Sequence, residues 1–332
     1  MSDEFNQGSS FAGKSVLVTG ASGFIGAHLC RRLISGCARV HAVSRRQRES
    51  SNIEWWQADL GDIVELRRTF RAARPDIVFH LASRVAGARD LGMVLPTFND
   101  NLASTVHLLT VATENACARV VLASSSEEPI GAGEDAFACS PYAAAKWASS
   151  MYGRMFTELY HLPVVMPRIF MTYGPDQKDL QKLVPFVVLR LLRGEVPALG
   201  SGVRRADWIY VDDVVEGLLR AAVTPGIEGC AFDLGSGVLT SVREVVEQIV
   251  EIIGPCVRPA FGALPDRPFE QERPADTAFL ISRLGYQPGT RLRQGLEATA
   301  AWYREHHRHP DVSAMDQAVL TAATELHSRT PR

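Results

Sequence analysis

The chain has 332 residues, of which 46% are hydrophobic and 22% are charged, and its formal net charge is −2. This composition excludes a disordered, collagen-like or highly charged chain, and the length fits two domains or one large α/β domain with an appended lobe. The balance of 35 Lys and Arg against 37 Asp and Glu predicts no general attraction to nucleic acid or to an anionic membrane.

The six cysteines contain no CxxC pair and have no regular spacing, so we expect neither a zinc site nor a disulfide framework. Free thiols of this kind fit a reducing cytoplasm. The first ten residues are polar and include two acids, unlike a signal peptide, and no segment approaches the ~20 apolar residues of a membrane helix. We therefore expect a cytoplasmic protein without a metal site.

In the first half of the chain, short β-branched runs alternate with longer stretches of helical spacing. The runs cover residues 14–19, 39–43, 76–81, 119–124 and 162–168. Strands that alternate with helices predict βαβ units, whose right-handed crossovers place helices on both faces of a parallel sheet. The predicted fold class is therefore α/β, with a Rossmann-type doubly wound parallel sheet.

From about Gly174 the chain changes to apolar helical segments at 182–194, 213–223 and 242–253, separated by long Pro- and Gly-rich connections that are typical of binding loops. We therefore predict a sheet domain at 1–173, a smaller α/β substrate lobe mainly at 174–305 with some segments returning to the sheet, and a polar tail at 306–332. In that tail we interpret His306, His307 and His309 as a solvated helix end rather than as metal ligands.

The glycine-rich segment GASGFIG follows the first predicted strand and opens a helix. Glycines at such a turn let the backbone approach a pyrophosphate, and the N–H groups of the helix N-terminus face the phosphates. This context predicts a dinucleotide site that includes Gly20, Ser22, Gly23, Phe24, Ile25 and Gly26, so the sheet domain is predicted to bind NAD(P).

The end of the second predicted strand reads HAVSRR and carries no acid that would bind the adenosine ribose hydroxyls. Ser44, Arg45 and Arg46 instead suit a 2′-phosphate. The sequence therefore favours NADP(H) over NAD(H), although a solvated basic turn that continues to Arg48 is the structural alternative.

Tyr142 and Lys146 lie four residues apart in SPYAAAKWAS, which places them on one face of a helix. A nearby ammonium lowers the pKa of a phenol from its usual ~10. We therefore expect Tyr142 to exchange protons near neutral pH while Lys146 also holds a ribose hydroxyl. An exposed aromatic–cation pair is the structural alternative.

With these motifs, residues 14–304 resemble the extended short-chain dehydrogenase/reductase family, in particular its nucleotide-sugar epimerases, dehydratases and ketoreductases. The segments that carry the resemblance occur in the family's order: GASGFIG, HLAS, SSSEEP, SPYAAAK, RIFMTYGPDQ, DWIYVDDV and DRPFE. The chain departs from the family pattern at Ile130, Met171 and Ala206, where the family usually has tyrosine, asparagine and arginine.

The resemblance implies site residues position by position. Tyr142 matches the catalytic acid/base, Lys146 its partner, and Ser126 the hydroxyl that binds the reacting sugar oxygen. Further cofactor positions are Asp59, Leu60, Leu81, Ala82, Ser83, Asp100, Ser124 and Ile169. Positions for the nucleotide sugar are Val85, Ser126, Met171, Lys182, Leu183, Arg205, Arg267 and Glu270.

The shared chemistry implied by the resemblance is hydride exchange at a sugar carbon, usually C4. We expect first a 4-ketoreductase, which consumes NADPH and needs only Ser126, Tyr142 and Lys146. A 4-epimerase recycles a tightly held cofactor, and a 4,6-dehydratase needs an extra acid and base, for which Glu127 and Glu128 are candidates. A non-catalytic NADP sensor is the remaining alternative, and such proteins commonly lack the Tyr/Lys pair.

Family members often dimerise through the helix that carries the catalytic tyrosine. The continuation of that helix places Trp147, Met151 and Met155 four residues apart, on one face. We therefore expect a homodimer, with core packing of these side chains as the alternative.

Overall fold

The computed structural model describes residues 10–85, 89–129, 136–266 and 270–306. Its main sheet contains eight strands, and every strand pair in the described sheet is parallel. The order is β10-β7-β5-β4-β1-β2-β3, with β6 paired to β7. The strands are β1 (Ser15–Thr19), β2 (Arg39–Ser44), β3 (Glu54–Gln57), β4 (Ile77–His80), β5 (Arg119–Leu122), β6 (Ser124–Ser125), β7 (Val164–Ile169) and β10 (Ala231–Leu234).

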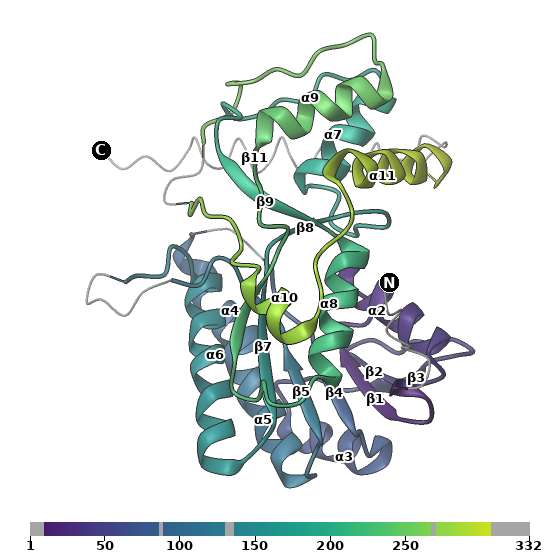
Figure 1. The fold of residues 1–332 in the computed structure, drawn as a ribbon, viewed down its shortest axis with the longest axis vertical. Coiled ribbons are helices and arrows are strands. Elements are labelled where there is room, and N and C mark those ends of the chain that lie inside the picture. The colour runs from purple at the N-terminus through teal and green to yellow at the C-terminus, as the bar shows by residue number, and fades with distance from the viewer. Residues whose placement is uncertain (1–9, 86–88, 130–135, 267–269, 307–332) are drawn as a thin grey trace.

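Helices cover both faces of this sheet, which confirms the doubly wound α/β prediction (Figure 1). Along β1, Val16 and Val18 join one buried apolar cluster and Leu17 joins another, because successive side chains of a strand point to opposite faces. The first face carries α2 (Phe24–Ser35) and α8 (Val211–Val223), and the second carries α3 (Ile63–Ala73), α5 (Ser104–Glu114) and α6 (Pro141–Tyr160).

A smaller lobe lies above the sheet in Figure 1 and has its own apolar core. Its sheet has the order β11-β9-β8, with β8 (Met171–Tyr173), β9 (Arg205–Tyr210) and β11 (Leu239–Ser241). Its helices are α7 (Leu183–Leu192), α9 (Val242–Ile253) and α11 (Leu292–His306). The second half also supplies β10 to the main sheet, and α10 (Ala278–Leu284) packs beside it.

Several elements, among them β3 and the turns between β4 and α5, lay outside the strand and helix predictions. β3 is an edge strand, EWWQ, whose side chains are half-buried or exposed, so it lacks the β-branched run of a buried strand. Between β4 and α5, the chain forms η1 (Leu91–Met93), α4 (Val94–Thr97) and the π-helical turn η2 (Phe98–Ala103). Of these, α4 and η2 pack against α6.

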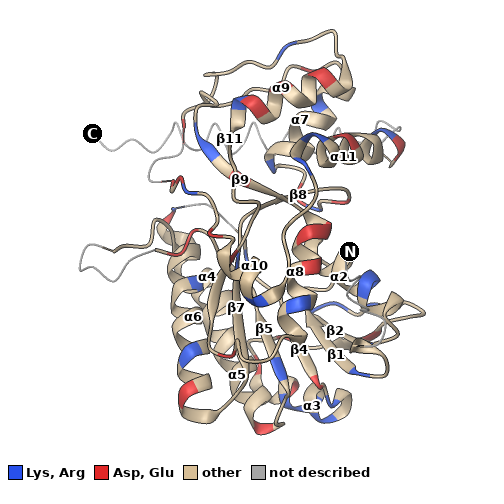
Figure 2. Cartoon of the chain, in the orientation of Figure 1, with Lys and Arg blue, Asp and Glu red and all other residues tan. Residues whose placement is uncertain are grey.

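Charged residues of both signs are spread over the sheet domain and the lobe (Figure 2), as the near-zero net charge predicts. Among the residues that the structure describes, no helix is long and apolar enough to cross a bilayer.

Candidate active site

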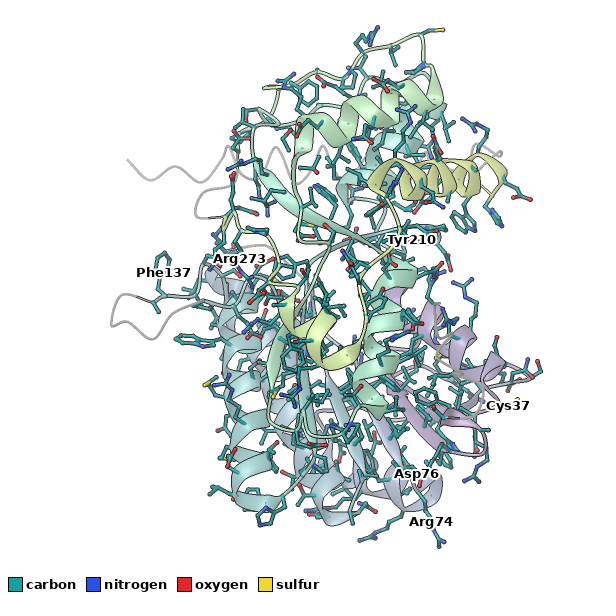
Figure 3. All side chains as sticks on the ribbon, viewed as in Figure 1. Cys37, Arg74, Asp76, Phe137, Tyr210 and Arg273 are labelled. Carbon is teal, nitrogen blue, oxygen red and sulfur yellow. The ribbon has the colours of Figure 1, made fainter. Side chains whose placement is uncertain are left out.

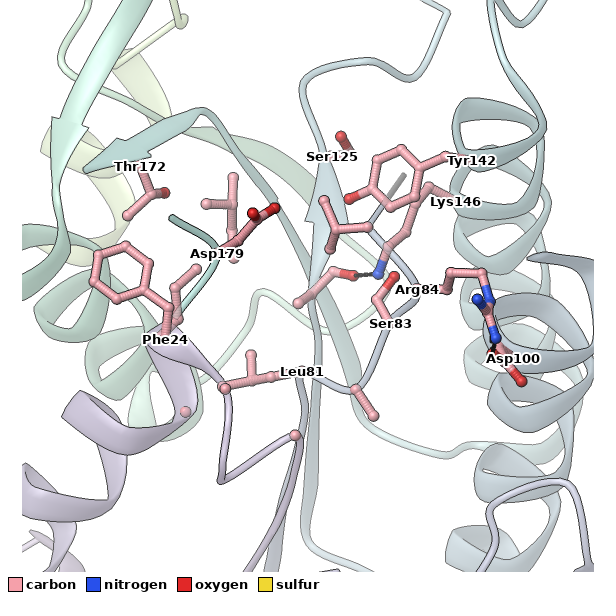
Figure 4. Close-up of a pocket in the computed structure, with 18 of the residues that line it drawn as sticks. Phe24, Leu81, Ser83, Arg84, Asp100, Ser125, Tyr142, Lys146, Thr172 and Asp179 are labelled. Atoms are coloured by element: carbon pink, nitrogen blue, oxygen red, sulfur yellow. Dashed lines mark hydrogen bonds and ion pairs between the residues drawn. The ribbon is translucent and has the colours of Figure 1, made fainter. Parts of the chain in front are cut away.

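A cleft of about 1160 Å³ opens between the carboxyl ends of the main-sheet strands and the lobe. All residues that the sequence assigns to the cofactor line this cleft. Ligands of doubly wound sheets bind at this edge because the strand ends and helix N-termini converge there. The cleft therefore joins groups that are far apart in the sequence into one site (Figure 4).

The glycine loop after β1 has the tight geometry that a bound pyrophosphate requires. Gly20 has φ +71°, and a Cβ there would lie 2.7 Å from the backbone nitrogen of Ala82. A Cβ on Gly26 would lie 2.2 Å from the carbonyl oxygen of Gly20. No side chain caps the N-terminus of α2, which leaves backbone N–H donors for an anion. The loop therefore fits the diphosphate of a nicotinamide dinucleotide.

The basic turn after β2 lines one end of the cleft with Arg45, Arg46 and Arg48. Ser44 lies at the base of the turn, where its hydroxyl accepts a hydrogen bond from the backbone nitrogen of Arg46 at 3.2 Å. Asp59, a cleft-lining carboxylate in the turn after β3, accepts the backbone N–H of Gly61 at 2.8 Å. This end of the cleft therefore presents guanidinium groups and one carboxylate that is held within its own turn.

The first two turns of α6 place Tyr142 and Lys146 in the wall of the cleft. Pro141 begins the helix, and the hydroxyl of Ser140 caps it by accepting the N–H of Ala143 at 3.1 Å, an arrangement that stabilises a helix start. Lys146 is buried, and its Nζ donates to the carbonyl of Ala123 at 2.8 Å. Figure 4 shows Tyr142, Lys146 and Ser125 on the same wall, opposite Thr172 and Asp179.

The structure corrects the expected effect of Lys146 on Tyr142. Burial raises the pKa of Tyr142 above its ordinary value, and a hydrogen bond with the Ser125 side chain lowers it only in part. Burial also lowers the pKa of Lys146 to about 8. The ammonium does not offset the burial because Nζ is bound to Ala123 and lies 6.0 Å from the centre of the Tyr142 ring. The sequence shows that the two residues share a helix face but cannot show how deeply that face is buried.

Ser125 is a site residue that the sequence reasoning missed. It is buried, bonds to Tyr142, and lines the cleft together with the predicted Ser126. Both hydroxyls are therefore candidates for binding the reacting oxygen. The repeated serines of SSSEEP could have suggested either one.

Glu127 and Glu128 are separated by the structure although they are adjacent in sequence. Glu127 lines the cleft and receives a hydrogen bond from Ser140 at 3.5 Å. Burial and the nearby Glu270 raise its pKa, against the opposing effects of Arg204 and Lys182. Glu128 lies outside the residues that line the cleft and accepts the hydroxyl of Ser150 at 3.0 Å.

The substrate end of the cleft contains most, but not all, of the predicted residues. Val85, Ser126, Met171, Lys182 and Glu270 line it. Leu183 instead packs against the lobe core, and Arg267 and Ile130 lie outside the described residues. Arg205 points away and pairs with Glu272, because the strand alternates. Arg204 and Ala206 therefore face the cleft, with Arg204 in an ion pair with Glu270 at 2.5 Å.

Several cleft residues could not be found from the sequence alone. Arg84 pairs with Asp100 at 2.6 Å on the cofactor side (Figure 4), and Arg273 enters from the segment before α10. Neither belongs to a motif used in the prediction. No group of three metal-binding side chains occurs in the described parts of the chain, and His307 and His309 lie outside them.

Known proteins resemble the chain along most of its length. The model of the NAD dependent epimerase/dehydratase family matches residues 16–235. A dTDP-glucose 4,6-dehydratase of Neisseria gonorrhoeae is 29% identical over 88% of this chain and 96% of the relative. A UDP-glucose 4-epimerase of Mycolicibacterium smegmatis is 31% identical, covering 87% and 98%. The structure of a Thermus thermophilus UDP-glucose 4-epimerase with NAD superposes with a TM-score of 0.78 at 26% identity, covering 88% and 99%.

Proposed function

Because the chain belongs to the NAD-dependent epimerase/dehydratase family, an extended short-chain dehydrogenase/reductase group, we propose that it is a nucleotide-sugar 4-epimerase. The relatives are dehydratases and epimerases, which favours these reactions over the 4-ketoreductase that the sequence placed first. The substrate would be a hexose bound to a nucleoside diphosphate.

One observation favours the epimerase over the dehydratase. Tyr142, Lys146 and the hydroxyls of Ser125 and Ser126 line the cleft together, and inversion at C4 needs no other proton-transfer groups. Elimination of water needs both an acid and a base, yet of the two adjacent glutamates only Glu127 faces the cleft.

In this mechanism, the glycine loop after β1 and the basic turn after β2 would hold a nicotinamide dinucleotide, which would supply hydride exchange at C4. Tyr142 takes the proton of the C4 hydroxyl. After the keto sugar has rotated so that its opposite face meets the cofactor, Tyr142 returns the proton to O4. Lys146 would hold a ribose hydroxyl of the cofactor. The hydrogen bond from Ser125 opposes the effect of burial on the pKa of Tyr142, and Ser125 or Ser126 orients O4. The cationic side chains of Lys182, Arg204 and Arg273 bind the diphosphate.

A 4,6-dehydratase is the second candidate, and Glu127 supports it. Its raised pKa favours the protonated carboxyl more than in an ordinary glutamate, as suits a group that gives a proton to the leaving hydroxyl of C6. The base that removes the proton from C5 would be Glu128, which must then leave its bond to Ser150.

Isotope transfer tests the proposal. Substrate deuterated at C4, as UDP-glucose or dTDP-glucose, is incubated with the enzyme without added cofactor, and the product is examined by NMR. We expect deuterium at C4 of a galactose-configured product, because the hydride returns to the carbon that it left. Deuterium at C6 would identify the dehydratase, and turnover only with added NADPH would identify the ketoreductase.

Variants of the same reaction provide the controls. Tyr142→Phe should lower turnover at least ~100-fold, because general acid–base catalysis contributes about 10²–10⁴. Glu127→Gln should leave epimerisation within about threefold if Glu127 has no proton-transfer role, and would abolish an elimination. Loss of epimerisation in Glu127→Gln would contradict the proposed mechanism.

For the cofactor, we propose that Arg45 and Arg46 turn the preference toward NADP(H). Similar proteins of known structure were solved with NAD, so NAD(H) is the alternative. The guanidinium groups in the cleft and the absence of an acid at the end of β2 support a bound 2′-phosphate.

We also propose that the protein forms a homodimer through α6 and the neighbouring α4. Met151 and Tyr152 of α6 are exposed, as are Leu95 and Phe98 next to α6, and contiguous exposed apolar side chains are typical of interfaces. Trp147 is half-buried, and Met155 packs against the core. The predicted face therefore centres on Met151.

The cytoplasmic location stays a prediction.

A further inference from the structure

Asp233 is a buried carboxylate that joins two arginines at the edge of the main sheet. It lies on β10 beside Arg168 of β7, and only 2% of its side chain is exposed. Its Oδ1 accepts Arg168 Nε at 2.6 Å and Arg273 Nη2 at 3.2 Å, and its Oδ2 accepts Arg273 Nη1. The two-point contact with Arg273 fixes the plane of that guanidinium.

Arg273 belongs to a segment whose backbone two buried carboxylates anchor just after Arg273. Asp207 of β9 accepts the backbone N–H of Ala275 at 2.9 Å, and Asp233 accepts that of Asp276 at 3.0 Å. The guanidinium of Arg273 lies 4.5 Å above the centre of the Phe170 ring. Arg273 therefore reaches the cleft from a fixed backbone at the junction of the two lobes (Figure 3).

Asp233, Arg168 and Arg273 together carry one excess positive charge. Burial alone would raise the pKa of Asp233, but hydrogen bonds from Arg273, the N–H of Asp276 and Arg168 hold it below its ordinary value. One carboxylate thus faces two guanidinium groups. The Nε of Arg273 is buried without a hydrogen-bond partner among the described residues, so Arg273 retains donor capacity that its contact with Asp233 does not use.

We propose that Asp233 is a positioning residue that orients Arg273 for the diphosphate of the nucleotide sugar without touching the substrate. This role rests on the proposed function, which supplies the diphosphate. A free arginine side chain has many rotamers, and fixing it in advance removes an entropic cost from binding. Asp233 would therefore strengthen diphosphate binding even though its own charge repels the ligand.

A double-mutant cycle measured by calorimetry tests this role, with UDP and dTDP as probes. Asp233→Asn should weaken diphosphate binding about tenfold, as expected for the loss of a charge-assisted contact. Arg273→Met should weaken it at least as much. The double variant should bind no more weakly than Arg273→Met, because Asp233 acts only through Arg273. Additive losses, or unchanged affinity in Asp233→Asn, would overturn the proposal.

Asp207→Asn is the matched control. Asp207 is the other buried carboxylate that anchors this segment, through the N–H of Ala275, but it does not bind the Arg273 guanidinium. Equal weakening of UDP binding by both variants would overturn the positioning role in favour of simple anchoring of the segment. NADPH titration serves as the folding control and should change less than about twofold. If the wild type binds NADPH but neither UDP nor dTDP, the proposed function itself fails.

If Asp233→Asn does not fold, Arg273→Lys tests the same contact by changing the arginine instead of the carboxylate. Lysine keeps the positive charge but cannot form the planar two-point contact with Asp233. We expect diphosphate binding about tenfold weaker than in the wild type. Wild-type affinity in Arg273→Lys would show that charge alone suffices and would overturn the proposal.

Discussion

Glu127 and Glu128 show how neighbouring carboxyl groups acquire different properties. Burial raises the pKa of both. Glu127 faces the cleft, whereas Glu128 is enclosed between β6 and α6. The pKa of Glu128 rises to about 7, and Ser150, the N–H of Ser125, Arg168 and Lys146 only partly oppose this rise. Glu128 is therefore a group whose ionisation opposes folding near neutral pH.

Glu128→Gln should stabilise the protein more at pH 8 than at pH 5. Between the unfolded pKa near 4.5 and the folded pKa of about 7, the folded protein binds more protons than the unfolded chain. Stability therefore falls as pH rises through this window. Glutamine removes this loss, with a limit of about 3 kcal/mol from the pKa difference. Urea unfolding at both pH values measures the effect.

The exposed Glu158 on α6 provides the control for this measurement. Glu158→Gln should change the free energy of unfolding by nearly the same amount at pH 5 and pH 8, because an exposed carboxyl has similar surroundings in both states. The same constant difference in Glu128→Gln would contradict a buried carboxyl at that position.

At the scale of elements, the cofactor end depends on where β2 stops. The strand ends at Ser44, so the next residues turn away from the sheet and place Arg45 and Arg46 in the cleft. Parallel pairing of β2 with β1 brings this turn to the same edge as the glycine loop. Two local features thus form one binding surface because the strands share a direction.

Replacing Arg45 and Arg46 together by alanine should weaken NADPH binding by about 10- to 100-fold and leave NADH binding within about threefold. Each charge-assisted hydrogen bond contributes about 1.5–3 kcal/mol, and only NADPH carries the 2′-phosphate. Fluorescence titration of both cofactors measures the preference.

Arg48→Ala is the matched control on the same turn, because Arg48 lies 5.6 Å from the centre of the Trp55 ring and has a contact of its own. It should affect the two cofactors alike. Wild-type binding of NADH as tightly as NADPH would contradict the proposed preference.

At the scale of the whole molecule, the cleft exists because the two lobes are joined on one side. β9 of the lobe continues directly into α8 on the main sheet, and His28 Nε2 of α2 lies 3.1 Å from the carbonyl oxygen of Pro175, which follows β8. The lobe has a separate apolar core, so it can close one side of the cleft without interrupting the core of the main sheet. The exposed apolar side chains of α4 and α6 lie on a different part of the surface from these joints.

Met151→Glu should convert the proposed dimer to a monomer at micromolar concentration. A charge at the centre of an apolar interface must be desolvated on association, which costs several kcal/mol when it has no partner. Leu159→Glu changes an exposed apolar residue near the other end of α6 and should leave the dimer intact. Light scattering after size exclusion measures both, and a monomeric wild type would contradict the proposal.

The predicted strands and the cofactor contacts depend mainly on local pattern. The five β-branched runs correspond to β1, β2, β4, β5 and β7, because a buried parallel strand needs a continuous apolar run. Gly20 and Gly26 can be recognised in the sequence because this turn requires glycine at both positions. A Cβ at either one would clash with backbone. At the substrate end, by contrast, Arg205 and Leu183 lie outside the cleft because strand alternation and lobe packing decide their directions.

The sequence by itself determined the parallel α/β sheet, the glycine-rich turn between β1 and α2, and the helix face shared by Tyr142 and Lys146, since each follows from spacing along a few residues. Only the tertiary structure decided which of Glu127 and Glu128 faces the cleft, that burial raises the pKa of Tyr142, and that Asp233 meets Arg273. These properties depend on groups distant in sequence, whose desolvation and contacts arise only when the elements pack together.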